Sequence, residues 1–114
     1  MEFKIKHKIW MESNGTLLMG KGHALLLRAL LTNPSLSEVA RQQEISYSKA
    51  WKMMKHLNQS AAEPVVQMIS GGKKGGQTSV TPYGKKLLEH FWQTHQQYEL
   101  FLKGKINKNT RSND

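Results

Sequence analysis

The chain has 114 residues, the length of one domain, and carries 17 Lys and Arg against 8 Asp and Glu, a formal net charge of +9. It has no cysteine, which excludes disulfides and thiolate metal sites. No apolar run approaches the roughly 20 residues of a membrane span, and the first residues lack the apolar segment of a secretory signal. These features predict a basic cytoplasmic domain whose partner is a polyanion and not a membrane.

The N-terminal part predicts a hairpin followed by a helix. Residues 3–12 roughly alternate between apolar and polar side chains, which is typical of a half-buried strand. Asn14-Gly15 is a strong signal for a two-residue turn, so residues 16–19 are expected to form the return strand. A leucine-rich helix is predicted over residues 22–32 and ends at Asn33-Pro34.

Two further helices follow, joined by a tight turn. Ser35 and Glu38 have the spacing of a capping box, which predicts a helix beginning there and ending near Gln43. Residues 44–46 form the turn, with Ser46 as the N-cap of a third helix that ends near residue 61. The predicted buried stripe of this helix consists of Ala50, Met53, Met54 and Leu57.

The C-terminal part predicts a second hairpin and a long helix. Residues 65–69 and 77–81 are expected to be strands, because both are apolar or β-branched and a glycine-rich segment separates them. Thr81-Pro82 is a typical helix start, and the helix is predicted to run over residues 82–103. Residues 104–114 are polar and without periodicity, so they are predicted to be a disordered tail.

This order of elements predicts an α+β fold, a winged helix-turn-helix with an N-terminal β-hairpin and a long C-terminal dimerisation helix. A short helix, a tight turn and a helix with a basic outer face are typical of the DNA-binding helix-turn-helix, and the second hairpin would be the wing. Residues 1–103 are therefore interpreted as a single DNA-binding domain, with residues 82–103 as its dimerisation helix.

Several segments, taken together and in order, resemble the N-terminal domain of the molybdate-responsive regulators, the ModE family. The similarity spans roughly residues 18–102. The segments that carry it are residues 20–22, Leu26-Leu27, residues 35–40, residues 45–51, Asn58, residues 63–66, the glycine-rich residues 71–76 and residues 81–84.

The resemblance implies a dimeric winged helix-turn-helix that binds DNA. Full-length members of the family continue into C-terminal modules that bind molybdate, and this sequence has none, so no oxyanion effector is expected. Glu44 stands in the turn where many helix-turn-helix motifs place a glycine.

The third helix and the wing supply the predicted DNA contacts. No carboxylate lies between Ser46 and Ala62, so the outer face of the helix is entirely basic. Its first residues are expected to approach base edges, and Lys52 to reach bases or phosphates. Lys55 and the lysines at the wing tip are expected to contact phosphates. The predicted DNA-binding residues are Ser46, Tyr47, Ser48, Lys49, Lys52, Lys55, Lys73 and Lys74. Trp51 is interpreted as a structural residue that closes the core with its ring edge partly exposed to water, and it is given no base-stacking role.

The last helix carries a seam of residues spaced three and four apart, typical of a helix that pairs with a second copy. The predicted dimerisation residues are Leu88, Phe91, His95, Tyr98 and Leu102. The alternative is that this face packs on its own domain.

Nothing in the pattern indicates an enzyme, a cofactor or a metal site. The eight acidic residues are dispersed and no Ser-His-Asp signature is present. His90 and His95 are five residues apart and do not share a helix face cleanly, so no metal site is predicted.

The predicted function is sequence-specific binding of double-stranded DNA by a homodimer that regulates transcription. One alternative is an RNA-binding or architectural basic protein, although no cluster of aromatic residues is evident on the basic face. Another is a winged-helix module that docks a protein, and a third is an oxyanion sensor.

Overall fold

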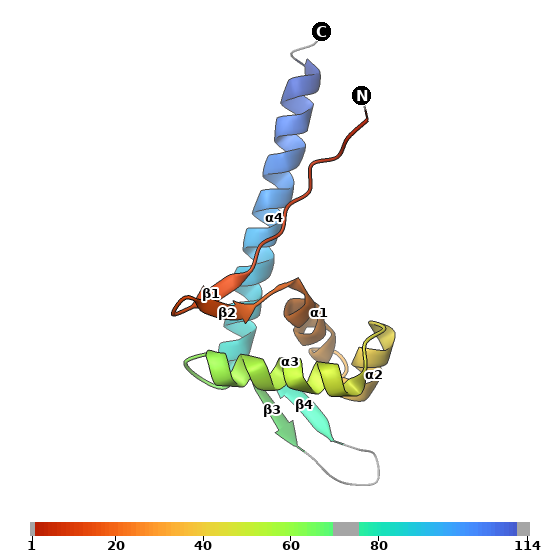
Figure 1. Ribbon diagram of the computed structural model, residues 1–114, viewed down its shortest axis with the longest axis vertical. Coiled ribbons are helices and arrows are strands. Elements are labelled where there is room, and N and C mark those ends of the chain that lie inside the picture. Colours follow the sequence, from red (N-terminus) through yellow and green to blue (C-terminus); the bar gives the residue numbers. More distant parts are fainter. Residues whose placement is uncertain (1, 70–75, 112–114) are drawn as a thin grey trace.

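The computed structural model describes residues 2–69 and 76–111, with side chains up to residue 104, and folds them into four helices and two antiparallel two-stranded sheets (Figure 1). The elements are β1 (Met11–Ser13), β2 (Thr16–Met19), α1 (Lys21–Leu30), α2 (Leu36–Gln42), α3 (Tyr47–Ser60), β3 (Val66–Ile69), β4 (Gln77–Val80) and α4 (Pro82–Arg111). The predicted α+β class and the predicted order of elements are confirmed.

The turn of the first hairpin has the predicted geometry, but its first strand is much shorter than predicted. Asn14 and Gly15 both have positive φ, at 54° and 80°, which matches the right-handed twist of the strands that they join. The pairing ends at Met11 opposite Met19, because α1 begins directly afterwards and no strand remains opposite residues 3–10. Residues 2–10 run beside α4 instead, as Figure 1 shows.

Three predicted helix starts are confirmed by their side-chain caps. The Ser35 hydroxyl accepts the Glu38 amide hydrogen at 3.3 Å, and the Ser46 hydroxyl accepts that of Lys49 at 3.0 Å. Thr81 caps α4 in the same way by accepting from the Gly84 amide at 2.9 Å. Each cap satisfies a backbone donor that has no partner inside the helix.

The reciprocal half of the predicted capping box at α2 is absent from these described residues. The amide of Ser35 donates to Asn33 Oδ1 at 3.1 Å, and Asn33 Nδ2 donates to Glu38 Oε2 at 2.9 Å. Asn33 therefore takes the position predicted for the Glu38 carboxylate, because it reaches the same amide from two residues away.

The core is built from side chains of β2, the first three helices, the β3–β4 hairpin and the first half of α4. Its largest fully buried side chains include Met19, Leu26, Met54, Leu57 and Phe91. The predicted stripe of α3 is confirmed except for Met53, which is partly buried at the edge of the core. Arg28 on α1 lies over the Trp92 ring, 4.1 Å from its centroid, and joins α1 to α4.

Helix α4 projects beyond the rest of the fold (Figure 1). It ends at Arg111, eight residues after the predicted end near Lys103, so the predicted boundary between helix and tail is wrong. No proline follows Pro82, and a single glycine at position 104 weakens a helix without ending it. At 1.5 Å per residue the 30-residue helix is about 45 Å long. No helix in the described part of the chain is long and apolar enough to cross a membrane.

Candidate nucleic-acid interface

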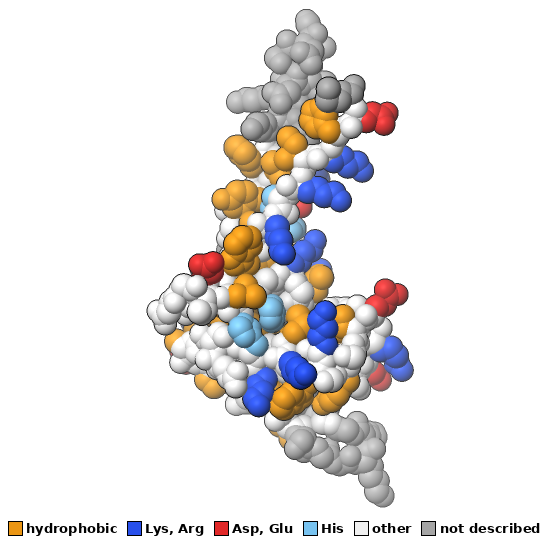
Figure 2. Space-filling view, viewed as in Figure 1, with side chains coloured by type: hydrophobic (Ala, Val, Ile, Leu, Met, Phe, Trp, Pro, Cys, Tyr) orange, Lys and Arg blue, Asp and Glu red, His pale blue; other side chains and the backbone are white. Residues whose placement is uncertain are grey.

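Helix α3 buries one face and exposes a basic one. Ala50, Met54 and Leu57 are buried, whereas the side chains of Lys49, Lys52 and Lys55 are exposed. Figure 2 shows Lys and Arg side chains on the surface where α3 lies, with His side chains next to them. Because the segment from Ser46 to Ala62 contains no Asp or Glu, no acidic side chain of the helix itself neutralises this face.

The turn before α3 fixes the direction of its first residues. Glu44 has a φ of 60°, in the left-handed region that favours glycine, and the Ile45 amide donates to the Ala40 carbonyl at 3.0 Å. The turn is therefore tight even without glycine. Tyr47, at 53% exposure, and Ser48 both face solvent at the start of the helix. The Ser46 hydroxyl oxygen caps the helix, so Ser46 helps to position Tyr47 and Ser48.

A hollow of about 430 Å³ lies between the basic face and the first hairpin. Lys49, Lys52 and His56 of α3 line it together with His23 of α1, and the centroids of the two histidine rings are 5.5 Å apart. His56 Nε2 donates to the Leu17 carbonyl at 2.8 Å, and the Gly20 amide donates to His23 Nδ1 at 3.1 Å. The pKa of His23 is lowered from 6.5, first by burial and then by His56. This pair was not predicted, because its two members are 33 residues apart and no local pattern joins them.

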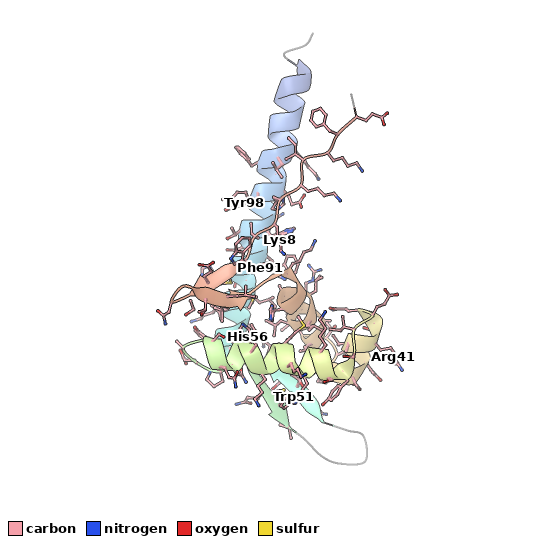
Figure 3. The ribbon with its side chains drawn as sticks, viewed as in Figure 1. Lys8, Arg41, Trp51, His56, Phe91 and Tyr98 are labelled. Atoms are coloured by element: carbon pink, nitrogen blue, oxygen red, sulfur yellow. The ribbon has the colours of Figure 1, made fainter. Side chains whose placement is uncertain are left out.

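A second hollow, of about 250 Å³, lies between α3 and the β3–β4 hairpin. Tyr47, Trp51, Met68 and Ile69 line it, and Lys55 Nζ lies 5.0 Å from the centroid of the Trp51 ring. The prediction that Trp51 closes the core is wrong, because its side chain is 38% exposed. Ala50 occupies the inward position, and the next residue is turned about 100° away from it. Figure 3 shows Trp51 and His56 at separate points along α3.

Asn58 attaches the β3–β4 hairpin to α3. Its Oδ1 accepts the amides of Val65 and Val66 at 2.8 and 3.0 Å, and its Nδ2 donates to the Val66 carbonyl at 2.9 Å. On the opposite strand, the Thr78 amide donates to the Pro34 carbonyl at 2.8 Å. Hydrogen bonds therefore hold both strands of the hairpin, β3 to Asn58 and β4 to Pro34. Lys73 and Lys74, predicted at its tip, lie outside the described residues.

The structure divides the predicted dimerisation residues into two groups. Leu88 and Phe91 are buried in the chain's own core, at 4% and 2% exposure, so the alternative of packing on the same domain holds for them. His95 and Leu102 are partly covered and line a cavity beside the N-terminal segment, and Tyr98 is half exposed. The periodicity of a helix shows which side chains are apolar but not which surface covers them.

In sequence, the chain is similar to proteins named as transcriptional regulators, as a molybdenum transport protein and as molybdenum-pterin-binding proteins. It is 40% identical to the "Molybdenum-pterin-binding protein MopB" of Rhodobacter capsulatus over 70 residues, 61% of this chain and 26% of that protein. It is 31% identical to the "Molybdenum transport protein ModE" of Azotobacter vinelandii over 77 residues, 68% of this chain and 28% of that protein.

A third relative is the "DNA-binding transcriptional dual regulator ModE" of Escherichia coli (strain K12), 34% identical over 64 residues, 56% of this chain and 24% of that protein. The chain thus spans only about a quarter of the length of these relatives. No protein-family model matches it.

Proposed function

We propose that this chain binds double-stranded DNA sequence-specifically and regulates transcription, with α2, the turn and α3 acting as a helix-turn-helix and β3–β4 as its wing. Residues 1–103 form the DNA-binding domain in this proposal. Helix α3 enters the major groove, whose width accepts one α-helix.

The observation that carries the proposal is the exposed face of α3, which carries three lysines and no acidic residue. Tyr47, Ser48 and Lys49 lie on its first turn, where a recognition helix reads base edges, and Lys52 and Lys55 follow at one-turn intervals. Phosphate contacts from the lysines supply affinity, and the first turn supplies specificity. The similarity to a relative named as a DNA-binding regulator supports the same function.

The proposal includes a homodimer formed through the outer half of α4. Tyr98 and Phe101 are 50% and 64% exposed there and share one side of the helix, an apolar surface that a monomer rarely leaves open. A two-fold axis along α4 gives a palindromic site with half-sites about 34 Å apart. Lys73 and Lys74, which the sequence predicts at the wing tip, are proposed to contact flanking phosphates.

Selection of bound sequences from random duplex DNA tests the proposal. The expected result is a palindromic consensus that is lost in Lys49→Ala and kept in Lys85→Ala, a matched lysine exposed at the start of α4. Recovery of no consensus would contradict specific readout, and a non-palindromic consensus would contradict the two-fold dimer.

One observation favours RNA as a second candidate partner. Tyr47 and Trp51 are exposed one turn apart on the basic side of α3, where single-stranded bases stack on aromatic rings. Competition between duplex DNA and structured RNA at one salt concentration decides between them. Preference for RNA, abolished by Trp51→Ala, would favour this second function.

A further inference from the structure

Two histidines and a glutamate, from segments far apart in the sequence, meet where the N-terminal segment crosses α4. His7 Nε2 lies 4.0 Å from Glu99 Oε1, and His95 Nε2 lies 3.9 Å from the same oxygen. All three ligand atoms lie within 4.8 Å of one another. His95 and Glu99 are one helical turn apart on α4, and His7 is brought to them by residues 2–10. Figure 3 shows the neighbouring Lys8 and Tyr98 at this crossing.

We propose that His7, His95 and Glu99 bind a divalent transition-metal ion of the zinc class, which fastens the N-terminal segment to α4. Two imidazoles and one carboxylate form a common catalytic-type zinc ligand set, in which water takes the fourth position. Zinc bonds of about 2.0–2.1 Å place tetrahedral ligands about 3.3 Å apart. The separations of 3.9 and 4.0 Å exceed this value by about 0.6–0.7 Å. Rotation of the half-exposed Glu99 side chain closes this difference.

The surroundings of these ligands also indicate a missing partner. His7 Nε2 is buried and makes no hydrogen bond to any described residue, although a buried ring nitrogen normally has a partner. A cavity of about 380 Å³ opens beside it, lined by His95, Glu99 and Leu102 among others. The His7 ring stacks on Tyr98 with a centroid separation of 5.9 Å, which holds its orientation. A metal ion would satisfy the free nitrogen.

The charges around the cavity decide which kind of ligand it takes. Lys6, Lys8, Lys21 and Lys103 line it, but their side chains are exposed, so their ammonium groups reach water and are screened. The group at the centre of the three ligand atoms is the Glu99 carboxylate, which repels an oxyanion and attracts a cation. A cation is therefore the ligand that this arrangement favours.

Calorimetry of the chelator-treated protein with Zn²⁺, followed by the visible absorption of the Co²⁺ complex, tests the proposal. We expect one bound ion per chain and a tetrahedral Co²⁺ spectrum, with affinity at least about tenfold lower in His7→Gln, His95→Gln and Glu99→Gln. Glu99 is half exposed, so its substitution leaves the fold intact and keeps the test decisive if a histidine variant misfolds.

Matched controls come from the same helix and from the other histidine pair. His90→Gln and Glu89→Gln change exposed residues of α4 and should leave binding unchanged. Zn²⁺ should also slow tryptic cleavage after Lys6 and Lys8 in the wild type but not in Glu99→Gln. No saturable binding, or binding lost in His56→Gln and retained in Glu99→Gln, would overturn the assignment.

Discussion

Removal of the Asn58 side chain should destabilise the chain and loosen the β3–β4 hairpin. Asn58→Ala deletes three hydrogen bonds of 2.8–3.0 Å to Val65 and Val66, which are both at most 1% exposed. At about 1 kcal/mol for each bond, the free energy of unfolding should fall by about 3 kcal/mol, because buried amides are left without acceptors. This is a large part of the roughly 5–15 kcal/mol that stabilises a typical domain.

Urea unfolding followed by circular dichroism measures this loss, with the exposed neighbour Gln59→Ala as a control that should stay within about 0.5 kcal/mol of wild type. Asn58→Asp keeps the two acceptor positions but places a carboxylate oxygen against the Val66 carbonyl, so it should also destabilise. A loss below about 1 kcal/mol in Asn58→Ala would refute the reasoning that this residue attaches the hairpin to α3.

Other substitutions test the buried contacts and α4. The lowered pKa of His23 means that the unfolded chain binds a proton more readily, so stability should fall as the pH drops below about 6.5. His23→Gln should flatten this dependence in thermal melts, and an unchanged slope would contradict it. Gly84→Ala should lower the melting temperature, because the added Cβ would collide with the Val65 carbonyl oxygen, even though alanine favours helices. A higher melting temperature would contradict this and show that the start of α4 can shift. Phe91→Glu should unfold the chain, because Phe91 is buried in the core, and a folded variant would contradict this position. Tyr98→Glu should leave the chain folded and convert the dimer to a monomer in sedimentation.

The elements that the sequence predicts well are those that local chemistry determines. The caps at Ser35, Ser46 and Thr81 and the Asn14-Gly15 turn depend on residues within three positions, and each is present. Residues 3–10 alternate like a strand, but a strand also needs a partner, and the start of α1 removes it.

Features that depend on packing between distant segments were not visible in the pattern. The periodicity of α4 identifies Phe91 as apolar but does not show that it is buried in the chain's own core. The His95–Glu99 spacing of one turn was a readable signal for a metal site, but its third member, His7, is 88 residues away. The exposure of Trp51 was readable from the sequence, because the predicted buried stripe of α3 places Trp51 about 100° away from Ala50.

The central claim is that this chain reads DNA sequence through α3. Fluorescence anisotropy should compare a duplex obtained by selection with a shuffled duplex of the same composition, at one salt concentration. The account predicts at least about 10³-fold tighter binding of the selected duplex and a preference that Lys49→Ala largely removes. Equal affinity for the two duplexes, or a preference that Lys49→Ala and Tyr47→Ala leave unchanged, would contradict it.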